Sequence, residues 1–200
     1  MSLAPGDDVL VAVEAHACAV LGADSGRASV SFVGVERLDV LRFGPDPNQL
    51  YRYLTLGMSR RPMADPAAAV VDDSGPRAEL VLTITGQHDS VLRPLAMLAA
   101  SPAVEGVVIR PGATLSAGGP LWDGSRFSAV LVGDPGDPGD PVPDLGLGPD
   151  SEPVRFLPVL PITAEEQAYK LVHGPEALTA LWSAQRLDLT DPHRPAARLP

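Results

Sequence analysis

Hairpin-like runs of β-forming residues precede most of the helical segments in this chain, and these segments lie mostly near its two ends. Residues 28–43 alternate polar and apolar side chains with a period of two, which indicates half-buried strands. Residues 78–85 (AELVLTIT) are nearly all apolar and indicate a central strand. Because strands and helices do not alternate strictly, a doubly wound parallel fold is disfavoured. The sequence predicts an α+β fold, with helices packed on a mixed, largely antiparallel sheet.

Local signals place the remaining elements. Further strands are predicted over residues 50–56, 104–109, 127–132 and 154–159, and helices over 8–21, 92–101, 163–172 and from 175 onward. Asp7 or Asp8 is expected to cap the first helix, whose inner stripe would be Val9, Val13, Ala17 and Val20. Gly34 is expected to form a bulge or a hairpin turn. Thr163 and Glu166 have the spacing of a capping box.

Composition supports a single folded domain over residues 1–200. Hydrophobic residues make up 45% of the chain, and 19 glycines with 22 prolines indicate many loops. This glycine and proline content stays below the roughly 25–30% that is typical of low-complexity disorder. Three segments are expected to be irregular: a mobile connection over 64–76, a flexible acidic Gly/Asp/Pro loop over 133–153, and a draped or frayed tail over 191–200.

The charge of the chain disfavours two classes of partner. The net charge is −10, and residues 133–153 contribute five aspartates and one glutamate without a basic residue. Nucleic acids and anionic lipid surfaces are bound through clustered lysine and arginine, so neither is expected as a partner. An acidic surface suits a basic protein partner. No apolar run approaches 18 residues and no basic residue precedes Arg27, so we expect a cytoplasmic protein.

The residues alone point to no catalytic group, metal or cofactor. Cys18 is the single cysteine, which excludes an intramolecular disulfide and a thiolate metal site. Gly57-Met58-Ser59 begins a nucleophile elbow, but Arg61 stands where that motif requires its second glycine. The aspartates at 134, 137 and 140 recur every three residues, which does not match a calcium-binding EF-hand loop. The four histidines, at positions 16, 88, 173 and 193, have no evident partner.

One loop carries a resemblance to a known family. Residues 55–63 (TLGMSRRPM) resemble the Thr-x-Gly-Met-Ser-x-x-Pro-Met signature of the suppressor-of-fused domain family. Residues 157–166 resemble the passage from strand to helix in that family, and Asp191-Pro192-His193-Arg194-Pro195 resembles its closing Asp-x-x-Arg-Pro. The similarity spans roughly residues 30–196. It implies an α/β or α+β protein-binding domain without catalytic activity, and relatives of this kind in bacteria are taken to be immunity proteins.

The expected function is therefore that of a non-enzymatic protein-binding module, including an immunity protein that neutralises a toxin. Its partner would be another protein, either an extended peptide or a toxin domain, bound at an open sheet edge or in a cleft beside the 57–63 loop. A small-ligand-binding protein or an enzyme with an unrecognised pocket is the alternative, and it would need a deep cavity with convergent titratable groups. A structural or regulatory dimer is a third possibility.

Two interpretations of the loop remain open. In the first, Met58 and Met63 offer an adaptable apolar contact to the partner, and Arg60 and Arg61 pair with its carboxylates. In the second, both methionines are buried and the motif is a structural turn. The residues expected to have a structural role are Thr55, Gly57, Ser59, Pro62, Pro158, Thr163 and Glu166.

Overall fold

A seven-stranded sheet in the order β1-β2-β3-β4-β7-β6-β5 forms the centre of the computed structural model, which describes residues 6–32, 34–64, 74–134, 142–149 and 151–200. Neighbouring strands are antiparallel except β4 and β7. The strands are β1 (Gly26–Phe32), β2 (Val35–Phe43), β3 (Leu50–Leu56), β4 (Arg77–Thr85), β5 (Thr114–Ser116), β6 (Ala129–Val132) and β7 (Val154–Ile162). The helices are α1 (Asp7–Leu21), α2 (Leu92–Glu105), α3 (Ala164–His173) and α4 (Pro175–Gln185), with 3-10 turns η1 (Met58–Arg60) and η2 (Asp89–Val91). The predicted α+β fold is confirmed.

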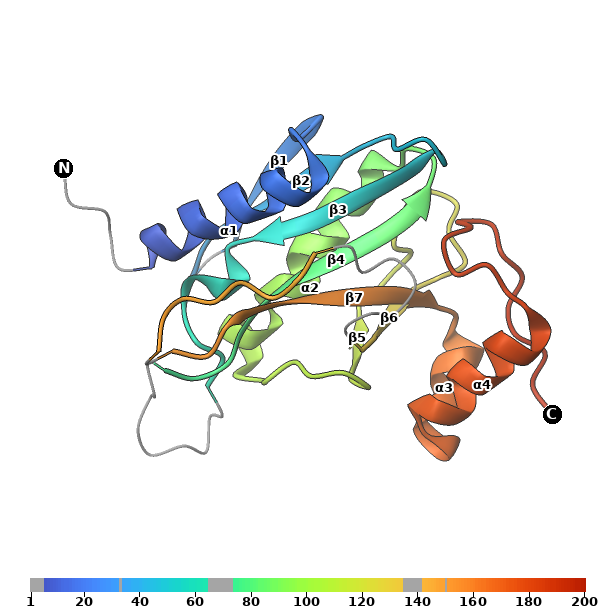
Figure 1. Cartoon of the computed structure of the whole chain (residues 1–200). Helices are drawn as coiled ribbons and strands as arrows, with labels where there is room; N and C mark the ends of the chain where they lie inside the picture. Colours follow the sequence, from blue (N-terminus) through green and yellow to red (C-terminus); the bar gives the residue numbers. More distant parts are fainter. Residues whose placement is uncertain (1–5, 33, 65–73, 135–141, 150) are drawn as a thin grey trace.

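Helices cover both faces of the sheet, so the faces of each central strand meet different helices (Figure 1). Ala17 of α1 packs with Leu41 of β2 on one face, whereas Val40 belongs to the cluster that includes α2 on the other. Residues 38–41 are therefore buried without interruption. The alternation predicted for residues 28–43 is seen in β1, which lies at the edge of the sheet. Gly34 lies between β1 and β2 with φ 80°, in the predicted hairpin turn.

Strand β7 changes its partner along its length. Its first part, up to Pro158, pairs in parallel with β4, and residues 159–162 pair antiparallel with β6. Pro158 has no N–H to donate, and its position at the changeover allows it to lie inside the sheet. Helices α3 and α4 follow β7, and Leu178 and Trp182 of α4 are buried against β6 and β7.

The strand predicted over 104–109 is wrong. Val104 and Glu105 are the last residues of α2, which continues past Pro102 and ends at Gly106. Gly106 adopts a left-handed conformation (φ 66°), and its N–H donates to the carbonyl of Pro102. The short strand β5 lies further along the chain and forms the other edge of the sheet.

Two details at the start of the chain also differ from expectation. Gly6 is the N-cap of α1 and has no side-chain hydrogen bond, so neither Asp7 nor Asp8 caps the helix, although both stabilise its positive end. Val20 is 41% exposed and does not belong to the inner stripe. Parts of two predicted irregular segments, residues 65–73 and residues 135–141 with 150, lie outside the described residues. None of the helices within the described ranges is long and apolar enough to cross a membrane.

A buried ion pair fastens the C-terminal tail to the fold. Arg194 is 1% exposed, and its two terminal nitrogens donate to the two carboxylate oxygens of Glu166 over 2.8 and 2.9 Å. The guanidinium also donates to the carbonyl of Pro161 over 2.8 Å, and it stacks over the rings of Phe127 and Trp182. The tail is therefore draped over the molecule and held there by a buried side chain, which decides between the two forms expected from the sequence.

Glu166 accepts hydrogen bonds from three further groups. As the predicted capping box requires, its carboxylate accepts from the N–H of Thr163, and the Thr163 hydroxyl accepts from the N–H of Glu166. The indole of Trp182 and the N–H of Ala197 also donate to this carboxylate, over 3.0 and 2.9 Å. Burial alone would raise the pKa of Glu166, but Arg194 and the backbone N–H groups outweigh it and hold that pKa below its ordinary value.

Candidate functional site

The loop after β3 is held from below by one buried carboxylate. Glu79 of β4 is fully buried, and its Oε1 accepts from the N–H groups of Gly57 and Ser59 over 2.9 and 3.0 Å. The hydroxyl of Ser59 donates to the same oxygen, and that of Thr55 donates to Oε2, each over 2.6 Å. Arg77 donates from the same strand to the carbonyls of Ser59 and Arg60. Strand β4 therefore fixes both the N–H groups and the carbonyls of this turn.

Burial and hydrogen bonding act on Glu79 in opposite directions. Removal from water raises the pKa of its carboxyl, and the hydrogen bonds from Ser59, Thr55 and Gly57 offset only part of that rise. Gly57 itself has φ 141°, a conformation that favours glycine, and a Cβ there would lie 2.7 Å from Cδ2 of Leu38. The turn is thus specified by a glycine without space for a side chain and by the carboxylate beneath it.

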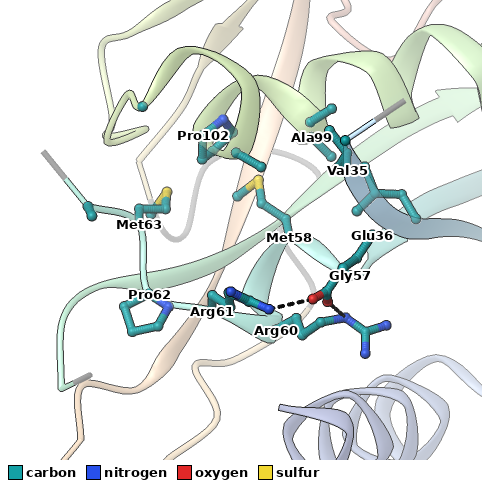
Figure 2. A pocket seen from close by; sticks show the side chains of 16 residues that line it. Val35, Glu36, Gly57, Met58, Arg60, Arg61, Pro62, Met63, Ala99 and Pro102 are labelled. Atoms are coloured by element: carbon teal, nitrogen blue, oxygen red, sulfur yellow. Dashed lines mark hydrogen bonds and ion pairs between the residues drawn. The ribbon is translucent and has the colours of Figure 1, made fainter. Parts of the chain in front are cut away.

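The other side chains of the loop line a pocket of about 430 Å³ (Figure 2). Met58, Arg60, Arg61 and Met63, the four residues predicted to bind a partner, all contribute to its walls. The opposite wall comes from the C-terminal half of α2, including Ala99, Pro102 and Ala103, and from the turn before β2. Met58 and Met63 are 7% and 6% exposed, so they form an apolar floor rather than a protruding contact. Pro62 also lines the pocket.

Charged groups gather at one side of the pocket. Figure 2 shows Glu36 between the two arginines: Oε1 accepts from Arg61 over 2.6 Å, and Oε2 pairs with Arg60 over 2.8 Å. Arg60 also pairs with Asp7 of α1, and its side chain is 17% exposed. The side chain of Arg61 is 77% exposed. The two arginines therefore differ, because Arg60 is tied into the fold whereas Arg61 faces solvent.

The loop motif separates into two sets of residues. Thr55, Gly57 and Ser59 contact Glu79, whereas the methionines and arginines line the pocket. Both methionines are buried, as the second interpretation expected, and they line the pocket from that position. Partner binding by the pocket residues stays a prediction. Pro158, Thr163 and Glu166 lie elsewhere, at the passage from β7 to α3, and do not line this pocket.

Sequence reasoning missed the two charged residues that organise these regions. Glu79 is the single acid in the largely apolar run of β4, and such an acid is a signal of a buried and hydrogen-bonded carboxylate. Arg194 was noticed only as part of a closing motif, and its pairing with Glu166, 28 residues away, could not be read from spacing.

The four histidines expected to lack partners all have a neighbouring ring, and the ring of His173 lies 4.3 Å from that of Tyr169. The ring of His88 lies 5.7 Å from that of Trp122 and 6.1 Å from that of His193. His16 lies 2.7 Å from the carbonyl of Pro143 through Nε2 and stacks on Phe156. Among the described residues, no three histidine, cysteine, aspartate or glutamate side chains come together in a way that could hold a metal ion.

The fold is shared with solved structures. A suppressor of fused homologue from Neisseria gonorrhoeae matches with a TM-score of 0.71 and 19% identity, over 97% of this chain and 99% of that one. A chain in the crystal structure of the Sufu–Fu complex matches with a TM-score of 0.58 and 10% identity, over 96% and 91%. Drosophila Suppressor of Fused matches with a TM-score of 0.60 and 13% identity over 96% of this chain, which spans 51% of the Drosophila chain. At these low identities, the structural matches show a common fold.

The sequence itself gives the family. No curated protein matches this chain in a direct comparison. The sequence model of the family described as Suppressor of fused protein (SUFU) matches residues 34–195, which include the 57–63 loop, Glu79, Glu166 and Arg194. A match over more than three quarters of the chain, together with the shared fold, establishes membership. This chain belongs to the suppressor of fused protein family.

Proposed function

We propose that this chain is a non-enzymatic protein-binding module that takes hold of its partner through the pocket between the 57–63 loop and α2. The observation that carries the proposal is the composition of this pocket: an apolar floor of methionine, alanine and proline side chains, with Arg61 exposed at its side. Such a site can bury an apolar side chain of a partner and pair with a carboxylate beside it. Family membership supports a protein as the partner.

The fold supports the proposal because the pocket is already formed in the chain without a partner. Glu79 and Arg77 hold the loop, and α2 packs against the same sheet, so both walls are fixed before a partner arrives. A rigid site loses little conformational entropy on binding, which favours affinity. Two exposed apolar residues, Val104 and Val107, follow the lining residues Ala103 and Gly106 in the chain.

An exposed residue at the rim gives the cleanest test. Ala103→Gln places a longer, uncharged side chain in the pocket, where it takes up space that a side chain of the partner would fill. We expect it to weaken partner binding about tenfold or more, which is equivalent to about 1.4 kcal/mol. Ala168→Gln, at an exposed position of α3, is the matched control. The partner is captured from the native host, identified by mass spectrometry, purified and titrated by calorimetry against all three proteins.

The two possible failures have different meanings. A partner that binds wild type and Ala103→Gln equally would refute the pocket as the binding site while leaving the module intact. Absence of any protein that binds the purified chain with a defined stoichiometry would refute the proposed function itself. Met58→Asp is a poorer probe, because Met58 is 7% exposed and a buried charge there would also destabilise the fold.

We further propose that this module is a cytoplasmic immunity protein, whose partner is a toxin domain. The support is the net charge of −10, because an acidic surface accelerates association with a basic protein. The test expresses the captured partner in a heterologous host with and without this chain. Arrest of growth by the partner alone, relieved by wild type but not by Ala103→Gln, is the expected result. A partner that is harmless when expressed alone would refute immunity and leave protein binding in place.

A further inference from the structure

A second pocket opens on the other side of Met63. Its volume is about 270 Å³, and Met63 lines both it and the pocket described above. Met63 is held firmly between them, because its N–H donates to the carbonyl of Pro76 over 2.8 Å and its sulfur accepts from the N–H of Ile109 over 3.4 Å. The two pockets therefore share Met63 as a fixed part of their walls.

Arginines dominate the charged lining of both pockets. Arg60 and Arg61 line the first, and Arg77, Arg110 and Arg155 line the second. The acidic side chains in these linings are Glu36 and Glu152, and Asp7 and Asp144 pair with Arg60 and Arg155 from outside. Among the described residues, these charges balance around the first pocket and leave one excess positive charge around the second, in a chain whose net charge is −10.

Three of these arginines are available to a partner. Arg61 pairs with Glu36 over 2.6 Å but is 77% exposed, and Arg110 is exposed and has no ion-pair partner within the part of the chain that the structure describes. Arg155 reaches Asp144 only at 3.9 Å, with both side chains accessible to water. Arg60 and Arg77, in contrast, are engaged by groups of the fold. Arg61 therefore lines the first pocket and Arg110 and Arg155 line the second, and Met63 belongs to the linings of both.

We propose that the two pockets together bind an extended acidic segment of the partner protein. One apolar side chain enters the first pocket, and carboxylates on either side of it pair with Arg61 at one end and with Arg110 and Arg155 at the other. Arginine suits this task because it can bind a carboxylate through two parallel hydrogen bonds. This inference rests on the proposed function and names the chemistry of the segment recognised.

The acidity of the whole chain does not oppose this local preference. Charges in water are screened over about 8 Å at physiological ionic strength, so carboxylates elsewhere on the surface act mainly on the approach of a partner. At contact distance the arginines of the lining decide which groups are accommodated. A basic partner that carries one acidic, apolar segment satisfies both conditions.

The test uses a random peptide library displayed on phage, selected against the whole chain. We expect the enriched peptides to carry an apolar residue flanked by aspartate or glutamate. A fluorescent copy of the most enriched peptide is then titrated by anisotropy. Arg110→Glu combined with Arg155→Gln should weaken its binding about tenfold or more, equivalent to about 1.4 kcal/mol, and added salt should weaken wild-type binding as well.

Matched variants separate this inference from the function on which it rests. Arg93→Glu combined with Arg126→Gln changes the charge by the same amount at exposed positions outside both pockets, and it should bind as wild type does. Arg110→Glu alone serves if the double variant fails to fold. If the enriched peptides carry no excess of aspartate or glutamate but bind Ala103→Gln more weakly than wild type, the acidic segment would be refuted. The pocket would remain the binding site. Recognition of an acidic segment would also be refuted if the peptide bound the Arg110 variants and the control variant equally well. No enrichment at all would count against both proposals.

Discussion

Replacement of Arg194 by methionine is expected to lower the free energy of unfolding by about 3–5 kcal/mol, because it leaves the buried carboxylate of Glu166 without its counter-charge. Methionine keeps the apolar stem of the side chain, so the loss reports the guanidinium, including its contacts with the rings of Phe127 and Trp182. The same guanidinium also holds the tail to the carbonyl of Pro161. Urea unfolding followed by circular dichroism measures the change as a lower midpoint at constant slope.

Arg198→Met is the control for this change. Arg198 lies in the same tail but is exposed, and it contacts Gln185 through its backbone, so its replacement should cost less than about 0.5 kcal/mol. Acid provides a second measurement. The pKa of Glu166 is lowered in the folded chain, so its contribution is present above the unfolded value and is lost as the pH falls through the folded value. Arg194→Met should reduce this loss of stability in acid. A variant as stable as wild type would contradict the role assigned to the ion pair of Arg194 and Glu166.

Short-range patterns predicted much of the architecture. The capping box of α3, the break at Gly174 followed by Pro175, and the apolar run of β4 all depend on residues within one turn or one strand. The helix end at Gly106 was also readable, since a glycine in the left-handed conformation is a common stop. The β-branched residues after it outweighed that signal, and their propensity wrongly predicted a strand. Local propensity failed there because the chain turned away from the sheet.

Long-range pairing could not be obtained in this way. The loop motif identified which residues line the pocket, but its opposite wall comes from α2, more than thirty residues later in the chain. Glu79 lies on the neighbouring strand, and only the register of β3 with β4 brings it under Gly57 and Ser59. A sequence shows that a buried acid is present but not which donors satisfy it. The site is thus the product of sheet register, whereas the motif alone specifies the turn.

That dependence on Glu79 leads to the second large effect. Glu79→Leu is expected to lower the free energy of unfolding by about 3–5 kcal/mol, because it leaves the buried N–H groups of Gly57 and Ser59 without an acceptor. Leucine has nearly the same volume and preserves the packing of β4, so the loss reports the missing hydrogen bonds. Chemical denaturation measures the stability, and hydrogen exchange at the two amides should accelerate well beyond that of other β4 and β3 amides.

Glu79→Gln is the matched variant that decides the cause. A glutamine keeps one oxygen for the N–H groups of Gly57 and Ser59 and offers its amide to the hydroxyl of Thr55. Because glutamine keeps these hydrogen bonds and carries no charge into the buried site, where burial raises the pKa of Glu79, its cost should stay at about 1 kcal/mol. If glutamine destabilised the chain as much as leucine, the negative charge would be the essential feature. If neither variant changed stability, the loop would be held by Arg77 and by packing instead.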